Sequence, residues 1–524
     1  FYNAGDKKLE RITIPAQVKS IGSYAFASCD TLSNITIGAA VDSIATYAFE
    51  NCRSLKAITL PANLRKLEHD VFNGTAISSL DIPNQVTDVT GVFNGLNGKL
   101  TSVTIGNGVK ALPEAAFNSF SVLKSVKMGT GITKVPQNTF NYCQALTDIT
   151  IGANVTALDA YSFGHCTALK QLSIPEKVSE IHENAFYGTT LTNLALNMEE
   201  IKDYAFNNRS DITQITIGKN VKRIGIQAFG STNISTVALP EGLTTIADRA
   251  FYGTKLQSIS IPASVETVGM QAFHSCNELA RVEIGAGSVS IGKQAFAASP
   301  KLTTVVMKEG GVKNIAAEAF YVCPLFQDVT LASIDSIGTS AFSDCPKLAS
   351  IHIPAKNVGA YAFANCESLA NVTFAEGMDS IADYAFNNSR NIEQLIFPNS
   401  LRTIGAYAFT ADNQEIALKD ITFGSGLETI GQYAFYRSTK VKDIVIPDKV
   451  KTIRLNAFSN CDNLRTVSVG SGVTTVEPFA FNANPNLMSI TWKSATRIEN
   501  DAFNSYAKNC LMYVTAKTEV PQQW

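Results

Sequence analysis

Residues Leu9 to Cys29 read LERITIPAQVKSIGSYAFASC, and this stretch is one complete unit of a repeat that fills the chain. Its pattern is L-x-x-I-x-I-P-x-x-V-x-x-I-G-x-x-A-F-x-x-C. The first part alternates apolar and polar residues, which predicts a short β-strand with one buried face. Proline or glycine then ends the strand, proline because it lacks a donor and glycine because it tolerates positive φ.

The Phe of the Ala-Phe pair recurs along the whole 524-residue chain at steps of 20 to 26 residues, mostly 22 or 23. The twenty-two anchor phenylalanines are Phe26, Phe49, Phe72, Phe93, Phe117, Phe140, Phe163, Phe186, Phe206, Phe229, Phe251, Phe273, Phe296, Phe320, Phe342, Phe363, Phe386, Phe409, Phe435, Phe458, Phe481 and Phe503. Periods of this length are typical of solenoids, in which each unit buries its apolar side chains only by stacking on its neighbours.

The repeat predicts a leucine-rich-repeat solenoid, that is, a curved, right-handed parallel β-solenoid of about 22 coils. Turns and short irregular or 3-10 segments are expected between the strands. No linker composition interrupts the repeats, so we expect one solenoid over residues 1–510 that begins mid-repeat, with its N-terminal cap absent. Residues 511–524 are expected to form a closing strand and a tail.

Two repeats depart from the pattern. The step from Phe186 to Phe206 is the shortest, and the step from Phe409 to Phe435 is the longest, with an expected insertion at Ala411 to Glu415. Changes of a few residues are expected to bend or bulge one coil, and they leave no room for a catalytic lid.

The unit from Leu9 to Cys29 resembles the BspA-like bacterial leucine-rich repeat, also called the Treponema type. The resemblance covers nearly the whole chain. It implies a parallel-stranded solenoid on a bacterial surface, often of gut or oral anaerobes, with roles in adhesion to host matrix proteins or to other cells. We therefore expect a cell-surface protein, lipid-anchored outside this sequence, or a secreted one.

Composition narrows the possible partners. Hydrophobic residues make up 45% of the chain and charged residues 17%, so a buried core is expected. The formal net charge of −2 gives no basic field for nucleic acid. No apolar stretch is long enough to predict a transmembrane segment.

The residues that usually carry chemistry fall on repeat positions. Nine of the ten cysteines stand three residues after an anchor, where other coils have Thr or Ser, which predicts small buried free thiols and no zinc site. The five histidines are scattered over distant coils. Gly-x-Gly follows the strand without a helix to cradle phosphate. We therefore expect no catalytic residue, no metal site and no cofactor.

Two surface features are better candidates for binding. The outward strand position is mostly Thr or Ser, which either suits an exposed pleated face or offers hydrogen bonds to an extended ligand. Two residues before the anchor, tyrosine occupies four consecutive coils at Tyr361, Tyr384, Tyr407 and Tyr433. In register these rings predict a stripe roughly 15 Å long that binds protein or glycan, or that only packs against the turn.

The leading hypothesis is a non-enzymatic recognition or adhesion scaffold whose extended faces bind a host matrix protein, another cell or a glycan. One alternative is an accessory or structural subunit of a bacterial outer-surface complex. A third is a polysaccharide-active β-solenoid enzyme, for which Asp420 and Asp443 come nearest to a carboxylate pair.

Overall fold

The structure is a computed structural model that describes residues 8–182, 184–287, 289–332, 334–412, 414–496, 501–503 and 510–514. Over these residues the chain is an all-parallel β-solenoid of about 21 turns without a helix, and this confirms the predicted fold class. The number of turns is one below the expected 22 because twenty-two anchors enclose twenty-one complete periods. The connections between strands are turns and irregular backbone.

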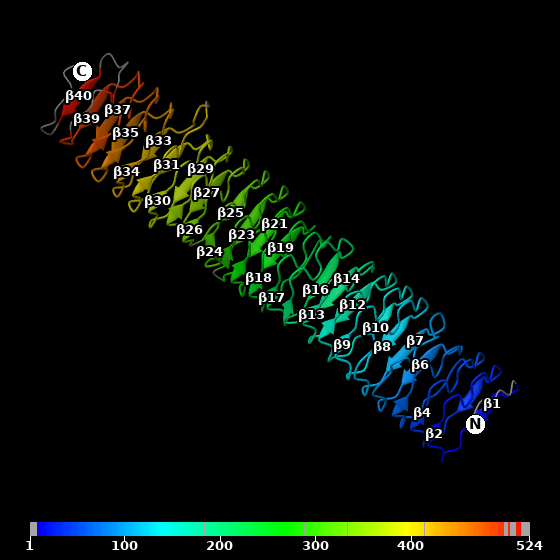
Figure 1. Ribbon diagram of the computed structural model, residues 1–524. Coiled ribbons are helices and arrows are strands. Elements are labelled where there is room, and N and C mark those ends of the chain that lie inside the picture. Colours follow the sequence, from blue (N-terminus) through cyan, green and yellow to red (C-terminus); the bar gives the residue numbers. More distant parts are fainter. Residues whose placement is uncertain are drawn as a thin grey trace. The chain divides into compact units, whose positions relative to one another are not determined.

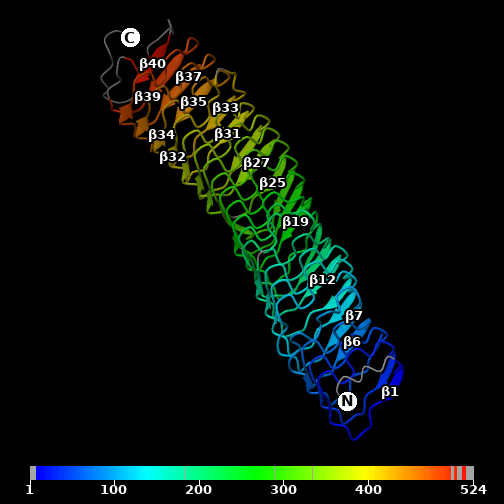
Figure 2. The ribbon, with the colours of Figure 1, turned by 45° about the vertical axis from the view of Figure 1, so that its right-hand side comes forward.

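Contacts divide the chain into two compact units, Phe1–Ala228 with Thr232–Pro240 and Phe229–Ser231 with Glu241–Trp524. Figures 1 and 2 show the successive coils of each unit stacked strand beside strand. The single solenoid over residues 1–510 remains a prediction. The mid-repeat start at Phe1 and the tail 515–524 lie outside the described residues. Leu511–Val514 form β40, which pairs in parallel with β39 (Ser489–Trp492).

The L-x-x-I-x-I segment forms the first strand of a coil. In the first unit these strands are β1 (Arg11–Thr13), β3 (Asn34–Thr36), β6 (Ser79–Ile82), β7 (Ser102–Ile105), β8 (Ser125–Lys127), β10 (Asp148–Thr150), β12 (Gln171–Ile174), β14 (Asn193–Leu196) and β16 (Gln214–Ile217). In the second unit they are β19 (Ser258–Ile261), β21 (Arg281–Ile284), β23 (Thr304–Met307), β25 (Asp328–Thr330), β27 (Ser350–Ile353), β29 (Asn371–Phe374), β31 (Gln394–Ile396), β33 (Asp420–Thr422), β35 (Asp443–Ile446) and β37 (Thr466–Val469), followed by β39 and β40.

The V-x-x-I segment forms a second, shorter strand that the sequence analysis did not predict. The first unit has β2 (Ser20–Ile21), β4 (Ser43–Ile44), β5 (Lys66–Leu67), β9 (Lys134–Val135), β11 (Ala157–Leu158), β13 (Glu180–Ile181), β15 (Glu200–Ile201) and β17 (Arg223–Ile224). The second unit has one continuous series: β18 (Thr245–Ile246), β20 (Thr267–Val268), β22 (Val289–Ile291), β24 (Val312–Ile315), β26 (Ser336–Ile337), β28 (Asn357–Val358), β30 (Ser380–Ile381), β32 (Thr403–Ile404), β34 (Thr429–Ile430), β36 (Thr452–Ile453) and β38 (Thr475–Val476).

Neighbouring coils pair at equivalent repeat positions. In β12, Leu172 and Ile174 are buried while Gln171 and Ser173 are exposed, and Leu172 pairs with Leu194 of β14. Because side chains alternate between the two faces of a strand, this register keeps most apolar side chains on the inner face, with Ile396 and Val445 as exposed exceptions. The register shifts between β22 and β24, where a bulge accommodates an extra residue.

The anchor phenylalanines form the centre of the core. All twenty-two are at most 4% exposed. Neighbouring rings stack, with centroids 5.4 Å apart and an interplanar angle of 2° for Phe117 and Phe140 in the first unit, and 5.2 Å and 0° for Phe273 and Phe296 in the second. In these pairs the anchor ring packs against the equivalent ring of the adjacent coil.

Glycines that follow the first strand have a different role from the one expected. None of Gly106, Gly424 and Gly470 has a positive φ, so the expectation based on left-handed backbone was wrong at this position. A Cβ on Gly106 would lie 2.5 Å from the carbonyl oxygen of Pro83 in the preceding coil. Glycine is needed here because adjacent coils approach backbone to backbone.

The cysteine position makes a hydrogen bond between coils. Cys52 Sγ lies 3.0 Å from the carbonyl oxygen of Phe26, and Cys366 Sγ lies 3.2 Å from that of Phe342. Ser389, at the same position, donates its hydroxyl to Phe363 at 2.6 Å. The position therefore favours a small side chain with a donor. Among the described cysteines all ten are free, and the nine at this position are buried.

Because these thiols are buried, we expect the folded protein to lose stability at alkaline pH. Burial raises the pKa of the Cys366 thiol to about 12. An unfolded thiol ionises near pH 8.5, so above about pH 8.5 the unfolded chain releases protons that the folded chain retains. Stability therefore falls as pH rises, by about 1.4 kcal/mol per pH unit for each such thiol. We expect Cys366→Ser to resist urea better than wild type at pH 10.5 but not at pH 7.5; equal pH dependence would contradict this.

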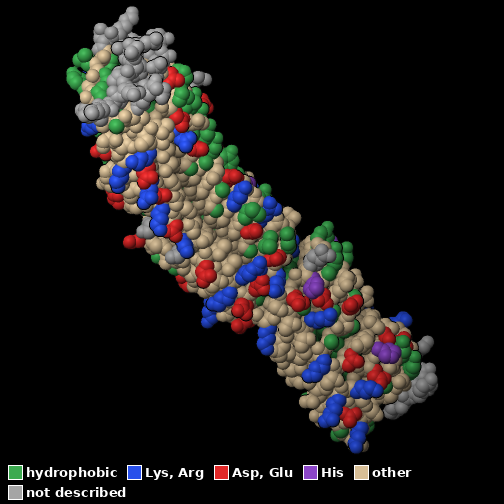
Figure 3. Space-filling view, turned by 60° about the vertical axis from the view of Figure 1, so that its left-hand side comes forward, with side chains coloured by type: hydrophobic (Ala, Val, Ile, Leu, Met, Phe, Trp, Pro, Cys, Tyr) green, Lys and Arg blue, Asp and Glu red, His purple; other side chains and the backbone are tan. Residues whose placement is uncertain are grey.

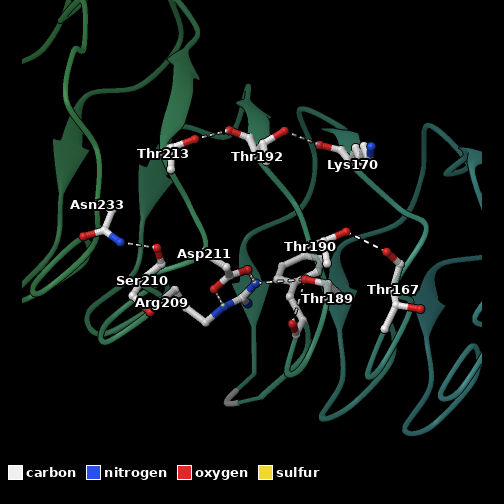
Figure 4. Close-up of polar contacts among 11 residues, drawn as sticks. Thr167, Lys170, Thr189, Thr190, Thr192, Arg209, Ser210, Asp211, Thr213 and Asn233 are labelled. Carbon is white, nitrogen blue, oxygen red and sulfur yellow. Dashed lines mark hydrogen bonds and ion pairs between the residues drawn. The ribbon is translucent and has the colours of Figure 1, made fainter.

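Figure 4 shows how polar side chains join consecutive coils around the shortest repeat. Thr190 donates its hydroxyl to the carbonyl oxygen of Thr167 at 2.7 Å, and Asn233 donates its amide to that of Ser210 at 2.6 Å. Such bonds repeat at a spacing of one coil. They satisfy carbonyl groups at the edges of the turns.

Arg209 stands where most coils have Cys, Ser or Thr. It donates two hydrogen bonds to Asp211, at 2.8 and 2.6 Å, and one to the Thr189 hydroxyl at 2.9 Å (Figure 4). Its guanidinium carbon lies 6.0 Å from the centroid of the Phe186 ring. The Arg209 side chain is only 17% exposed, so it covers the apolar layer between the two coils joined by the 20-residue step.

We expect Arg209→Ala to destabilise the first unit by about 1–2 kcal/mol, because it uncovers Phe186 and leaves the half-buried Asp211 without its bidentate partner. Urea unfolding measures this change. Arg53→Ala is the matched control, since Arg53 is 73% exposed and its contact with Asp30 is 3.8 Å long. The control should change stability by less than about 0.5 kcal/mol. Equal effects of the two substitutions would contradict the role given to Arg209.

Candidate binding surface

The turn around most anchors has two positions with left-handed backbone, two residues before and two residues after the Phe. In the coil of Phe26 these are Tyr24, with φ 57°, and Ser28, with φ 59°. The N–H groups of Tyr24, Phe26 and Ser28 donate to carbonyl groups of the next coil, at 3.3, 2.8 and 2.7 Å. Because most coils bear a side chain at these positions, the hydrogen bonds between coils must offset the cost of left-handed backbone, about 1–2 kcal/mol per residue.

The four candidate tyrosines occupy the first of these positions in consecutive coils. Ring centroids lie 4.7 Å apart for Tyr361 and Tyr384, 4.8 Å for Tyr384 and Tyr407, and 4.7 Å for Tyr407 and Tyr433, with interplanar angles of 4°, 4° and 8°. We call these residues the tyrosine ladder. Their φ angles of 54° to 58° hold the four side chains in one orientation.

The rings of the tyrosine ladder cover one another's faces, so the ladder offers mainly ring edges and hydroxyl groups to a ligand. Burial raises the pKa of the inner tyrosines Tyr384 and Tyr407, and the neighbouring ring hydroxyls add to this shift. Tyr436 closes one end by packing edge-on against Tyr433, at 5.3 Å and 77°. At the other end Tyr361 is the most exposed of the four, at 42%.

A second row of side chains runs beside the ladder, at the left-handed position that follows the anchor. Asn365 donates to Asp344 at 2.9 Å, and Asn388 donates to Asn365 at 3.1 Å. We call Asp344, Asn365 and Asn388 the amide ladder. Asn365 and Asn388 are thus in the same coils as Tyr361 and Tyr384, and Asp344 is in the coil before Tyr361.

A groove lies between these two rows at the exposed end of the tyrosine ladder. Its volume is ≈ 390 Å³. The groove exists because the coil before Tyr361 has Ser340 at the tyrosine position, a side chain too small to cover the next ring. Its walls include Glu318, Tyr321, Ser340, Asp344, Tyr361 and Asn365. We call it the ladder-end groove.

The remaining tyrosines at this position do not form a comparable row. Tyr24 and Tyr47 stack at 5.0 Å, but the next coil has Asp70 at this position. Tyr204 is 58% exposed. The Thr and Ser side chains at the outward strand position, such as Thr36 and Ser173, are exposed as predicted. Figure 3 shows lysine and arginine side chains interspersed with acidic ones over the visible surface.

One histidine contact was missed by the sequence analysis. His69 Nδ1 lies 2.8 Å from Asp70 Oδ2, and His69 Nε2 lies 3.4 Å from the Thr46 hydroxyl. A hydroxyl, an imidazole and a carboxylate in this order also form the catalytic triad of hydrolases with a nucleophilic hydroxyl. The Thr46 hydroxyl, however, donates to Glu68 at 2.8 Å, and the Thr46 N–H donates to the same oxygen at 2.9 Å. The Lys66 ammonium and the Thr46 donors lower the pKa of Glu68 to about 2, so Glu68 stays a charged acceptor.

The equivalent bond in another coil joins the Leu455 N–H to Glu477 at 2.8 Å, so the contact between Thr46 and Glu68 belongs to the repeat. The carboxylates considered for an enzyme, Asp420 and Asp443, are exposed. Asp443 accepts the Thr466 hydroxyl at 2.5 Å. Within the described ranges no group of three or more His, Cys, Asp or Glu side chains is placed to hold a metal ion. The same ranges contain no apolar helix long enough to cross a membrane.

Comparison with known sequences matches nearly the whole chain to one repeat type. Residues 1–95, 90–210, 199–326, 313–416 and 413–518 match the profile described as BspA type leucine rich repeat region. No curated protein matches the chain.

Several solved structures show some similarity to this chain. A leucine-rich repeat protein from Bacteroides ovatus is 17% identical, over 79% of this chain and 91% of its own, with a TM-score of 0.38. The pneumococcal vaccine antigen PcpA is 20% identical, over 66% and 84%, with a TM-score of 0.34. A leucine rich cell surface protein from Faecalibacterium prausnitzii is 21% identical, over 84% and 88%, with a TM-score of 0.23. These scores are low, so family membership rests on the repeat profile.

Proposed function

Because this chain belongs to the BspA-type leucine-rich repeat family, we propose that it is a non-enzymatic recognition protein of the bacterial cell surface, or a secreted one. We propose further that it binds a protein or glycan ligand through the tyrosine ladder, Tyr361, Tyr384, Tyr407 and Tyr433. Solenoids of this kind present long surfaces suited to extended ligands.

The observation that carries this proposal is the row of four rings in register beside the amide ladder. Tyrosine is favoured in interfaces because it offers a large apolar area and a polar tip while losing little conformational entropy. Here the left-handed backbone and the stacking already fix the rings, so binding requires little further ordering. The Asn365 and Asn388 side chains add directional hydrogen-bonding groups at the same spacing.

An array of host matrix proteins and glycans should identify the ligand, and a variant with alanine at all four ladder positions tests the site. Alanine is compatible with this backbone, since Ala115 occupies the same position with φ 55°. We expect the quadruple variant to bind at least about tenfold more weakly, because central aromatic anchors contribute most to such interfaces.

The matched control is a variant with alanine at Tyr24, Tyr47, Tyr161 and Tyr204, which occupy the same repeat position outside the ladder. This control should bind the array ligand like wild type. If the ladder variant also binds normally, the four rings only pack against the turn and the proposed site is wrong.

A further inference from the structure

The ladder-end groove has a chemistry that the tyrosine ladder itself lacks. Tyr384 covers one face of the Tyr361 ring at 4.7 Å, and the small Ser340 leaves the opposite face open toward the groove. Tyr361 is accordingly the ladder tyrosine with the largest exposed fraction, 42%. The groove therefore contains the one uncovered aromatic face at this end of the row.

The charge of the groove is negative. The carboxylates of Glu318 and Asp344 line it, and the lining residues, all in the described part of the chain, include no lysine or arginine. Glu318 has a cationic neighbour in Lys293 at 3.6 Å, but Lys293 is 55% exposed, and such solvated pairs contribute little. Asp344 accepts hydrogen bonds from Asn365 and Ser343, both at 2.9 Å, and these fix the orientation of its carboxylate.

Carboxylate oxygens that already accept one hydrogen bond retain further acceptor capacity, since each carboxylate has about four lone-pair sites. A cation entering the groove therefore meets acceptors already in place and an open ring face. The volume of the ladder-end groove, ≈ 390 Å³, lies toward the lower end of the range for small-ligand pockets, about 300–1,000 Å³, and suits a single side chain.

We propose that the ladder-end groove binds the guanidinium group of an arginine side chain from a protein ligand. Guanidinium is planar, so it stacks on the open face of Tyr361 while its N–H groups donate to Asp344 and Glu318. An ammonium group has the charge but not the planar face, and a neutral sugar brings no positive charge to Asp344 and Glu318. This inference rests on the proposed function and names the ligand class for one end of the proposed site.

Saturation-transfer NMR on the full chain tests the proposal with three small probes, N-acetyl-arginine amide, N-acetyl-lysine amide and N-acetyl-citrulline amide, together with the neutral sugar chitotriose. Citrulline retains the planar shape and loses the charge. We expect the arginine probe to bind most tightly, the citrulline probe at least about tenfold more weakly, and added salt to weaken the arginine probe selectively. Tighter binding of chitotriose or of citrulline would overturn the assignment.

Two variants place the interaction in the groove. Ser340 has a φ of 54°, which is close to the φ angles of the ladder tyrosines, so this backbone is compatible with tyrosine. Ser340→Tyr would extend the tyrosine ladder by one coil, and the new ring would cover Tyr361. It should reduce binding of the arginine probe at least tenfold. Glu318→Gln with Asp344→Asn should do the same while leaving citrulline binding unchanged. Asp420→Asn, an exposed carboxylate on β33, is the matched control and should have no effect.

Failure of this inference is distinguishable from failure of the proposed function. Ser340→Tyr leaves all four ladder tyrosines in place, so binding of the array ligand by this variant together with its loss in the quadruple alanine variant would retain the proposed function and remove the arginine site. If Ser340→Tyr does not fold, the carboxylate variant decides: unchanged binding of the arginine probe overturns the proposal.

Discussion

Replacing Phe273 by alanine is expected to destabilise the second unit by ~3–5 kcal/mol, the range measured when a buried aromatic ring is removed from a core. Phe273 is fully buried, and its ring stacks on Phe251 at 5.2 Å and 4° and on Phe296 at 5.2 Å and 0°. Alanine removes both stacking contacts and leaves a cavity between two coils. The surrounding backbone is fixed by hydrogen bonds between coils, such as Phe273 N–H to Ala295 at 2.7 Å, and collapses poorly into that space.

Urea unfolding measures the loss, and hydrogen exchange locates it. In a solenoid each repeat contacts only its neighbours, so faster amide exchange should be concentrated in the coils of Phe251, Phe273 and Phe296. Phe273→Leu is the control, because it retains most of the apolar volume, and it should destabilise by about 1–2 kcal/mol. A loss below about 1 kcal/mol for the alanine variant would mean that the anchors do not determine the stability of the stack.

The parts of the fold that the sequence predicted correctly are those in which one side chain type is required in nearly every coil. The anchor Phe and the small residue three positions later are buried with few exceptions, so their period was visible without a structure. The second strand was missed because most of its copies are only two residues long, as in β4, and two residues carry no readable alternation.

The backbone of the turn was not predictable for a different reason. Left-handed φ is usually inferred from glycine. Here the position two residues before the anchor is glycine only at Gly91 among the left-handed residues, and other coils have larger side chains there, such as Tyr407, Gln294 and Asn456. Hydrogen bonds from the neighbouring coil impose this conformation, and a sequence read coil by coil does not show them.

The candidate site was predictable in part. The spacing of Tyr361, Tyr384, Tyr407 and Tyr433 placed the four rings in one row, and the structure stacks them. That the rings cover one another's faces depends on side-chain orientation, which spacing does not give. The ladder-end groove depends on Ser340, because its small side chain leaves the ring of Tyr361 in the next coil uncovered. The sequence of one coil alone does not show this relation.

The same close approach of coils makes Gly424→Ala a severe substitution despite its small volume. Gly424 is buried after β33, and a Cβ there would lie 2.0 Å from the carbonyl oxygen and 2.4 Å from the carbonyl carbon of Pro398 in the preceding coil. Both atoms belong to the backbone, so relief requires the two coils to move apart. That movement would stretch the pairing of β31 with β33, in which Leu395 lies opposite Ile421. We expect Gly424→Ala to lower the free energy of unfolding by about 3 kcal/mol, the upper end of the destabilisation that overpacking usually causes.

Gly22→Ala separates this steric effect from the general effect of replacing glycine. Nothing lies within 4 Å of the position that a Cβ would take on Gly22, and its φ is not positive. Alanine there should leave stability unchanged or raise it by about 0.4–1 kcal/mol, because it restricts the unfolded chain. Urea unfolding of both variants gives the comparison. If Gly424→Ala proves as mild as Gly22→Ala, adjacent coils can separate easily, and the glycine after the first strand serves the turn alone.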